Sequence, residues 1–533
     1  MKKKLIILSL FCVTITVAQN KGPENWQTLD PVANKIYGTG AEEAYKLLKN
    51  KPSKTVIVAV IDSGVDPNHE DLKSVIWVNK AEIPDNGIDD DNNGYIDDVN
   101  GWNFLGGKNG DIINEATELS RLYQRYTKIF AAKDTSNLKN EELKEYEKYK
   151  KIATEYLDEK AKDEQQLNFY LIISSFLKKI KTQNNDTLTN EALKNYKPEN
   201  EMEARIKKSF KRGLLFGLKL KEIEAQLKEA EENTSNRLKY SSMNADSIRS
   251  YIVGDDINNL EERFYGNNHI ESSSALHGTH VSGIIAAIRD NNIGIKGIAN
   301  NVKIMCIRAV PNGDERDKDV ANAIRYAVDN GASVINMSFG KYYSPEKAAV
   351  DAAVKYAQSK NVLLIHAAGN ESKNKDIETS YPTRNLLTGE IAPNWIEVGA
   401  SSYKKGENII GSFSNYGEKT VDLFAPGVDI YSTIPNNKYT DESGTSMAAP
   451  STTGSAAILL EYFPSLSAYE VKSTLMNNVE LYNKKVYVPG LYKLRLIKKL
   501  GQKRVKKKIN SLCISGGFVN VKNAVKFLIE TKK

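Results

Sequence analysis

Three short stretches of the sequence each carry a side chain that could take part in acyl transfer. Asp62 closes the apolar run TVIVAVID, where a shielded, hydrogen-bonded carboxylate can stay ionised and hold a histidine in one tautomer. His277 precedes an apolar helix whose small residues allow close packing, so its imidazole projects from a rigid end. Ser446 starts a helix rich in small residues, where the helix dipole and backbone N–H groups can stabilise an oxyanion. A hydroxyl, an imidazole and a carboxylate are the groups that nucleophilic catalysis uses.

Taken singly, each of these residues also has an ordinary structural interpretation. An aspartate at a strand end is unremarkable in isolation, and a serine at the start of a helix is usually an N-cap. His277 and His280 are three residues apart, which could suggest metal ligands. Zinc sites need three or four protein or water ligands, and the chain has only five histidines with no third ligand of matching type nearby. A zinc site is therefore not expected.

Considered together, the stretches resemble the subtilisin family of serine proteases, in which Asp, His and Ser follow in this order. The resemblance extends over residues 26–110 and about 251–529. Its motifs, in order along the chain, are DSGVD around Asp62, HGTHVSGIIAA around His277, AAGN ending at Asn370 and GTSMAAP around Ser446. Four specific matches in the same order are hard to obtain by chance.

The resemblance implies a role for each of these residues. Ser446 would attack the peptide carbonyl, His277 would take its proton and return it to the leaving amine, and Asp62 would orient the imidazole. The side chain of Asn370 would donate to the oxyanion together with the Ser446 backbone N–H. The reaction would pass through an acyl-enzyme intermediate.

The resemblance also places a binding site for extended peptide. One wall of the pocket for the P1 side chain would be formed by Ser338, Phe339 and Gly340 of the stretch NMSFG. Ala368 and Gly369 would form the other wall, and Ser380, before YPT, would lie near the floor. Small residues on both walls, with Ser380 near the floor, favour a medium or large apolar P1 side chain.

An acidic loop, residues 84–104 (PDNGIDDDNNGYIDDVNGWNF), has the ligand spacing of a calcium site. An EF-hand-type loop takes ligands at positions 1, 3, 5, 7 and 9, with glycine at 6. The predicted ligands are Asp89, Asp91, Asn93, the Tyr95 carbonyl and Asp97, with Gly94 at the turn. Asn100 replaces the glutamate expected at position 12, so Asp98 is added as a compensating ligand.

Calcium bound by this loop is expected to be structural, because the missing glutamate and the lack of clear flanking helices argue against a sensor. Subtilases commonly use calcium to hold surface loops in place, and no organic cofactor is expected. The alternative is an Asp/Asn-rich loop that binds nothing.

The elements that must position these residues alternate along the chain. Continuous apolar, β-branched runs typical of buried parallel strands lie at residues 55–62, 301–310, 331–339 and 361–370. Helical patterns with alanine-rich stripes lie between them at residues 319–332 and 345–361. The alternation predicts a doubly wound, mostly parallel α/β sheet of the subtilisin type.

A charge-rich helical segment is expected to interrupt this fold. Apolar residues recur at helical spacing near both of its ends, at Leu119, Leu122, Tyr126 and Phe130 and at Leu220, Ile223, Leu227 and Ala230. Residues 181–201 are expected to be a loop between its helices. The predicted parts are a signal peptide (1–18), a first catalytic part (19–110), a helical insertion near the cleft (111–250) and a second catalytic part (251–533). A lid, an exosite and a replacement for a prodomain are all compatible with this insertion.

The N-terminus has the pattern of a secretory signal peptide. Lys2, Lys3 and Lys4 precede an apolar stretch that ends at a small-residue site around Ala18. That stretch is shorter than the roughly 20 residues a transmembrane helix needs, so stable membrane insertion is not expected. Phe11 before Cys12 does not fit lipoprotein processing. The protein is therefore expected to be secreted or periplasmic.

Cysteine and charge add two weaker expectations. Cys306 and Cys513 are too few for a disulfide framework, and Cys306 is expected to be a buried thiol. Residues 481–508 carry eleven Lys or Arg and no acid, which could suit an anionic surface or nucleic acid. No nucleic-acid-binding module is recognisable there, so a solvated loop or hairpin is favoured and no nucleic-acid partner is expected.

The leading hypothesis is a secreted, monomeric endopeptidase that acts on proteins or peptides. The competing hypothesis is a catalytically idle binding protein that acts through its helical insertion. A binding protein has no need to retain Asp62, His277, Asn370 and Ser446 together, which favours the enzyme. An esterase is disfavoured because GTSMAAP lacks the G-x-S-x-G elbow.

Overall fold

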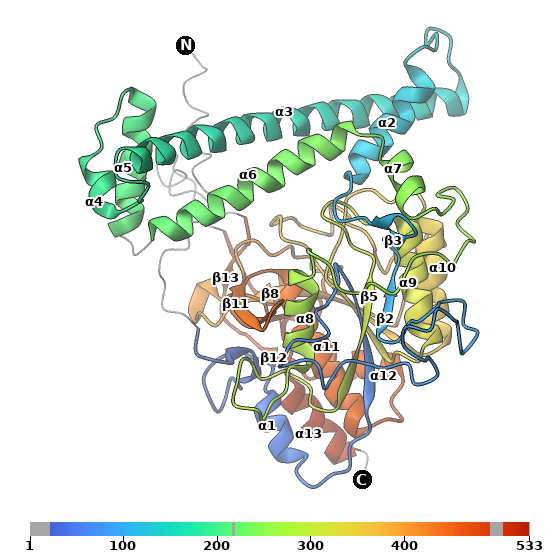
Figure 1. Ribbon diagram of the computed structural model, residues 1–533. Coiled ribbons are helices and arrows are strands. Elements are labelled where there is room, and N and C mark those ends of the chain that lie inside the picture. The colour runs from blue at the N-terminus through green and yellow to red at the C-terminus, as the bar shows by residue number, and fades with distance from the viewer. Residues whose placement is uncertain (1–21, 216–218, 491–504, 532–533) are drawn as a thin grey trace. The chain divides into compact units, whose positions relative to one another are not determined.

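The computed structural model describes residues 22–215, 219–490 and 505–531, which divide into two compact units (Figure 1). Residues 22–118, 244–490 and 505–531 form an α/β unit, and residues 119–215 with 219–243 form a helical unit. The predicted signal peptide, residues 1–18, lies outside the described residues.

The α/β unit is built on a nine-stranded sheet in the order β12-β15-β9-β8-β7-β6-β1-β5-β2. Only the β12–β15 pair is antiparallel. The strands are β1 (Val56–Asp62), β2 (Gly101–Asn103), β5 (Val302–Arg308), β6 (Val334–Met337), β7 (Leu363–Ala367), β8 (Trp395–Ser401), β9 (Leu423–Pro426), β12 (Glu480–Leu481) and β15 (Gly517–Phe518). The prediction of a mostly parallel α/β sheet is confirmed, and four of its strands lie in the four apolar runs.

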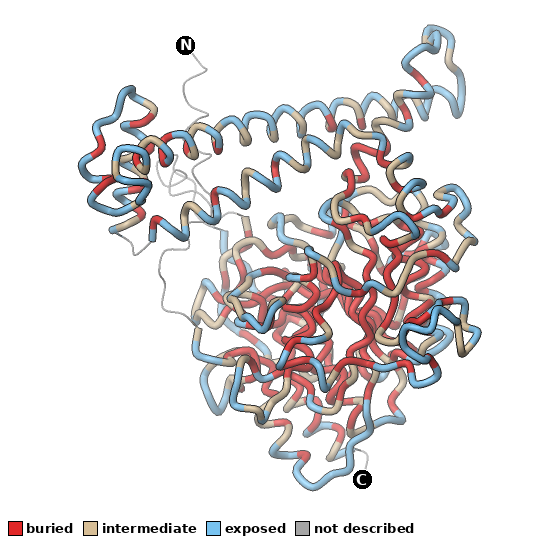
Figure 2. The backbone as a smooth tube through the Cα atoms, in the orientation of Figure 1, coloured by how far each residue is buried: buried red, intermediate tan, exposed pale blue. Residues whose placement is uncertain are grey.

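Helices cover both faces of this sheet because its strands are apolar on both sides. In β1, Val58 and Val60 pack into one hydrophobic cluster, and Ala59 and Ile61 into the other. The first cluster includes α1 (Ala41–Leu47), α8 (Leu276–Ala286), α11 (Thr445–Tyr462), α12 (Ala468–Asn477) and α13 (Val521–Thr531). The second includes α9 (Asp317–Asp329) and α10 (Lys347–Ser359). Figure 2 shows these buried residues concentrated in the sheet and in the helices beside it.

Short elements complete the α/β unit. Two-stranded ladders are formed by β3 (Gly106–Gly107) with β4 (Gly110–Asp111), β10 (Ile430–Ile434) with β11 (Lys438–Glu442), and β13 (Val486–Tyr487) with β14 (Lys506–Lys507). The 3-10 helices are η1 (Trp26–Thr28), η2 (Gly406–Asn408) and η4 (Ile509–Ser511). The β13–β14 ladder pairs residues 486–487 with 506–507, and residues 491–504 of the basic tract, predicted as a loop or hairpin, lie outside the described residues.

The helical unit consists of α2 to α6, with its own hydrophobic core. The helices are α2 (Glu118–Phe130), α3 (Asn140–Thr182), α4 (Asn190–Asn195), α5 (Glu201–Leu215) and α6 (Leu220–Ser242). Its core contains Phe176 of α3, Phe210 of α5 and Leu227 of α6. The short helix α4 lies within residues 181–201, which the sequence predicted as a loop. Its N-cap, Thr189, accepts a hydrogen bond from the Ala192 N–H at 3.0 Å, which stabilises the first turn.

The helical unit, residues 119–243, is shorter at both ends than the predicted insertion, residues 111–250. At the first end, the Glu115 N–H donates to the Asn312 carbonyl at 2.9 Å, which ties residues 111–118 to the α/β unit. At the second end, α7 (Ala245–Ile252) packs into the α/β unit through Arg249. The chain therefore re-enters the α/β unit before the predicted boundary.

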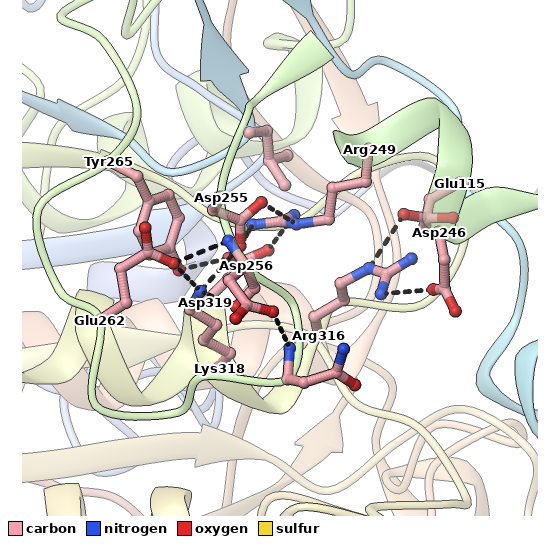
Figure 3. Close-up of polar contacts among 12 residues, drawn as sticks. Glu115, Asp246, Arg249, Asp255, Asp256, Glu262, Tyr265, Arg316, Lys318 and Asp319 are labelled. Atoms are coloured by element: carbon pink, nitrogen blue, oxygen red, sulfur yellow. Dashed lines mark hydrogen bonds and ion pairs between the residues drawn. The ribbon is translucent and has the colours of Figure 1, made fainter. Parts of the chain in front are cut away.

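Arg249 lies at the centre of a buried ion network that fixes this re-entry point (Figure 3). Its guanidinium binds the Asp255 carboxylate at 2.8 and 3.1 Å and the Asp319 carboxylate of α9 at 2.8 and 2.7 Å. Lys318, also on α9, donates to Asp255 at 2.9 Å and to Glu262 at 2.7 Å. Residues 249–262 and helix α9 are thus held together by an ion network whose centre, Arg249 with Asp255 and Asp319, is fully buried.

Cys306 and Cys513 are both free thiols, buried in different hydrophobic clusters of the α/β unit. Burial raises the pKa of each thiol, which leaves both unreactive. Across residues 22–531, as far as they are described, no helix is both long and apolar enough to cross a membrane.

Candidate active site

Asp62 and His277 form a hydrogen-bonded pair at the carboxyl end of β1. His277 Nδ1 lies 2.7 Å from Asp62 Oδ1, which also accepts the Ser63 N–H at 2.8 Å. The Asp62 side chain is 2% exposed, whereas that of His277 is 38% exposed. A carboxylate beside Nδ1 favours the tautomer that carries its proton on Nδ1, so Nε2 is left as an acceptor on the accessible side of the ring.

A glycine allows this pair to form. Gly278, next to His277, packs against the loop that follows β1, and a Cβ at this position would lie 2.2 Å from the Gly64 carbonyl oxygen. Any larger residue would push α8 away from β1. The glycine after the histidine therefore sets the distance between His277 and Asp62.

The pKa of His277 is raised above its ordinary value. Burial disfavours the imidazolium, but the charge and hydrogen bond of Asp62 outweigh that effect, and Glu442 adds a smaller contribution of the same sign. An imidazole with a raised pKa is a stronger base, and its protonated form is stabilised.

Ser446 lies in the first turn of α11, held by the end of β6. Its hydroxyl donates to the Ser338 carbonyl oxygen at 3.1 Å, and its own carbonyl accepts from Ser338 Oγ at 2.9 Å. Asn336 Nδ2 in turn donates to Ser338 Oγ at 2.9 Å. No hydrogen bond links Ser446 to His277 among the residues described, so the hydroxyl must exchange its Ser338 partner for Nε2 before proton transfer.

Asn370 is oriented by the residue next to Ser446. Its Oδ1 accepts the Thr445 N–H at 2.9 Å and the Thr445 hydroxyl at 3.0 Å. The Thr445 hydroxyl oxygen also accepts the Gly369 N–H at 3.0 Å. Because Oδ1 is occupied twice, Nδ2 points away from Thr445 and is available to a ligand.

Ser446 and Asn370 line one cavity of about 220 Å³. Of the predicted pocket walls, Ser338, Phe339, Gly340 and Gly369 also line it. Ala368 does not, because its side chain is fully buried in a hydrophobic cluster with Phe424. The preceding Ala367 lines the cavity instead, together with Glu371 and Ser380. Alternation along an extended chain explains this shift by one residue.

In the acidic loop, three carboxylates converge. Single oxygens of Glu82, Asp91 and Asp98 all lie within 4.8 Å of one another. The amide groups of Asn79 and Asn93 both donate to Asp91 and Asp98, at distances of 2.8 to 3.3 Å. The pKa of Asp98 is raised to about 6, because burial outweighs its hydrogen bonds and Asp91 adds repulsion. Such a cluster of hard oxygen ligands suits a divalent cation such as calcium.

Two other predicted ligands of this loop, Asp89 and Asp97, accept hydrogen bonds from backbone N–H groups. The Asp89 carboxylate accepts the N–H groups of Asn93 and Gly94 at 3.0 and 2.8 Å. The Asp97 carboxylate accepts two more backbone N–H groups, those of residues 86 and 87, at 3.1 and 2.9 Å. The Tyr95 ring is buried in the second hydrophobic cluster, and its carbonyl stays a predicted ligand. Asp89 and Asp97 therefore shape the loop and lie outside the carboxylate cluster.

Glu82 was missed by the sequence analysis because it precedes the loop motif. One of its oxygens accepts the N–H groups of residues 90 and 91, and the other accepts that of residue 97. A lone glutamate seven residues before the first motif position gives no signal in sequence spacing. Its role depends on the folded path of the loop.

Comparison with known proteins agrees with the motifs. A family model described as the subtilase family matches residues 53–510. The chain is 42% identical to the thermophilic serine proteinase of Bacillus sp. (strain AK1), over 37% of this chain and 45% of that protein. It is 37% identical to subtilisin DY of Bacillus licheniformis, over 37% of this chain and 68% of that protein.

A crystal structure of a cold adapted subtilisin-like serine proteinase aligns with 31% identity and a TM-score of 0.34. That alignment covers 39% of this chain and 70% of the other. The chain spans less than half the length of the first of these relatives.

Proposed function

The chain belongs to the subtilase family, and we propose that it is a serine endopeptidase with Asp62, His277 and Ser446 as its triad. The observation that carries this proposal is the 2.7 Å contact between His277 Nδ1 and Asp62 Oδ1, at the carboxyl end of β1. Asn370 on the same cavity as Ser446 supplies the fourth group that acyl transfer needs.

Proton transfer in the proposed reaction runs through Nε2 of His277. The Ser446 hydroxyl gives up its hydrogen bond to the Ser338 carbonyl, passes its proton to Nε2 and attacks the substrate carbonyl carbon. Asp62 stabilises the imidazolium that forms. The imidazolium then protonates the leaving amine, and a water molecule hydrolyses the acyl-enzyme by the same route.

Negative charge that develops on the substrate oxygen is proposed to be stabilised by Asn370 Nδ2 and the Ser446 backbone N–H. Thr445 fixes the Asn370 amide through two hydrogen bonds, so the donor is oriented before the reaction begins. A donor that needs no reorganisation is most effective where charge appears only in the transition state.

Replacing Asn370 with alanine is expected to lower kcat about 10²- to 10³-fold with little change in KM, because the lost hydrogen bond forms only in the transition state. Steady-state kinetics on a chromogenic peptide would measure both constants. Asn385→Ala, at an exposed asparagine outside the cavity, is the matched control and should match the wild type. A rise in KM with unchanged kcat would contradict the proposed role.

Labelling with a fluorophosphonate probe tests the proposed activity directly. Folded, calcium-loaded protein should be labelled at Ser446, located by peptide mass mapping, and should hydrolyse a mixed peptide library. Absence of both labelling and hydrolysis would favour the catalytically idle binding protein. The proposed substrates are proteins or peptides, and no nucleic-acid partner is proposed.

We further propose that the protein acts as a monomer, outside the cytoplasm, after removal of residues 1–18. In this proposal, a helical insertion that lies within the predicted residues 111–250 divides a protease domain whose two parts precede and follow it in the sequence. The motifs on either side of the insertion belong to one family, which supports this organisation.

Calcium is proposed to bind Glu82, Asp91 and Asp98, with the Asn79 and Asn93 amides completing the oxygen set after rotation. Two of these carboxylates, Glu82 and Asp98, are buried and lie close together. A bound cation would remove their mutual repulsion and hold the loop closed. Its role is structural, since the cluster belongs to a different loop from the catalytic groups.

Chelation with excess EGTA is expected to lower the melting temperature and speed self-digestion without changing which bonds are cleaved. A ligand present at 100 times its Kd stabilises the folded state by about 2.7 kcal/mol, which sets the scale of the loss. Calorimetry with and without chelator would measure it. The Glu82→Gln variant should respond less to the chelator, whereas Asp85→Asn, at an exposed loop residue, should respond like wild type. An unchanged melting temperature in wild type would contradict the calcium proposal.

A further inference from the structure

The cavity beside Ser446 has a polar group at Ser380. The Ser380 side chain is buried, and its Oγ lies 2.6 Å from Nζ of Lys375, which is also buried. An ammonium group can only donate, so Ser380 Oγ is the acceptor in this contact. The described residues include no acceptor for the hydroxyl proton of Ser380, which is therefore free to donate into the cavity.

The charges behind Ser380 balance one another. Lys375 Nζ lies 2.5 Å from Glu397 Oε1, and Glu397 also contacts His366 Nδ1 at 3.0 Å and accepts from Trp395 Nε1 at 2.9 Å. Although burial alone would raise the pKa of Glu397, Lys375 and His366 lower it to about 2, so this carboxylate stays ionised. The Lys375 charge is thus already compensated and does not call for an anionic ligand.

The rim of the same cavity carries a negative charge. Glu371 is exposed and lines the cavity, with one oxygen 2.8 Å from Asn415 Nδ2. A ligand carboxylate that enters the cavity would lose its hydration and be repelled by Glu371. It would not be compensated by Lys375, whose charge is already paired with Glu397. A neutral group that accepts a hydrogen bond meets neither cost.

We propose that this site selects a P1 side chain ending in a carboxamide, glutamine or asparagine, and that Ser380 is the specificity-determining residue that donates to its oxygen. The inference rests on the proposed function, because it takes the cavity beside Ser446 as the P1 pocket. The ring of Phe339 and the glycines of the walls leave apolar surface for the side-chain methylenes. The polar floor thus replaces the apolar preference that the small wall residues alone suggested.

Peptides that differ only at P1 test the inference. Wild type is expected to cleave P1 glutamine with a kcat/KM about fivefold above P1 methionine, which has similar length but no amide, and above P1 glutamate by a similar factor. In Ser380→Ala the ratio of kcat/KM for P1 glutamine to that for P1 methionine should fall to about one. Ser402→Ala is the matched control. It removes a buried serine hydroxyl that lies outside the cavity and accepts a hydrogen bond from the Lys404 N–H, so this variant should keep the wild-type preference.

The possible results distinguish a failure of the proposed P1 specificity from a failure of the proposed protease function. Wild type that cleaves methionine or glutamate as well as glutamine overturns the specificity inference while leaving the protease intact, whether or not the variant folds. A glutamine preference that survives in folded Ser380→Ala overturns the role of Ser380. If no peptide is cleaved and the fluorophosphonate probe does not label Ser446, the proposed function itself fails.

Discussion

Alanine in place of Ser446 is expected to lower kcat for peptide hydrolysis by about 10⁶-fold, the size of the loss known for subtilisin when its nucleophile is removed. Without the hydroxyl no acyl-enzyme can form, and His277 has no proton to accept. Asn370 Nδ2 remains, so slow hydrolysis by directly attacking water would still exceed the uncatalysed rate. Single-turnover assays with a long incubation would measure both the loss and the residual rate.

The fold of the Ser446→Ala variant should be unchanged. The hydroxyl makes one hydrogen bond, to the Ser338 carbonyl, while the backbone carbonyl of residue 446 keeps its bond from Ser338 Oγ. An equal melting temperature would therefore separate lost chemistry from lost structure. Retention of more than a tenth of wild-type kcat, or probe labelling of the variant, would show that Ser446 is not the nucleophile.

The core of the fold could be predicted because each buried strand is short, apolar and continuous. Residues 55–62 became β1, since a strand covered by helices on both faces needs apolar side chains at every position. The helical pattern of residues 319–332 became α9, which begins and ends two to three residues earlier. The ends of helices and of the insertion are harder to predict, because caps and tertiary contacts set them. Arg249 is an example, since its contact with Asp319 holds α7 in the α/β unit.

The candidate site was predictable where sequence neighbours carry the chemistry and unpredictable where folding brings distant residues together. Asp62 and His277 each lie in a local motif that the sequence shows. They are far apart in the sequence, and folding brings His277 Nδ1 to 2.7 Å from Asp62 Oδ1. The contact of Lys375 with Glu397 joins a loop to β8 and leaves no trace in local sequence. Glu82 likewise joins Asp91 and Asp98 only through the path of the acidic loop.

Replacing Arg249 with methionine is expected to destabilise the α/β unit by about 3–5 kcal/mol, the cost of leaving buried carboxylates without their cation. Arg249 is 1% exposed and binds Asp255 and Asp319 through two hydrogen bonds each. Lys318 still reaches Asp255, whereas Asp319 keeps, among the described residues, a hydrogen bond only from the Tyr265 hydroxyl, at 2.7 Å. Methionine fills similar volume without charge, so the loss measures the missing cation more than a cavity.

Chemical denaturation in a Ser446→Ala background, which prevents self-digestion, would measure this effect. Lys355→Met is the matched control, because the Lys355–Glu390 pair of the same unit is 45% and 62% exposed and should contribute about 0–1 kcal/mol.

The effect of Arg249→Met on stability should depend on pH through Asp255. Burial raises the pKa of Asp255, but Arg249 and Lys318 lower it by a larger amount, so the net shift is downward. An aspartate whose pKa is lower in the folded than in the unfolded state stabilises the fold at pH values above its unfolded-state pKa, near 4. That stabilisation is lost as the pH falls through the folded-state pKa. The difference in free energy of unfolding between Arg249→Met and its parent should therefore be largest near pH 7 and become smaller toward pH 4. A difference at pH 7 as small as that caused by Lys355→Met would contradict a role for the network in stability.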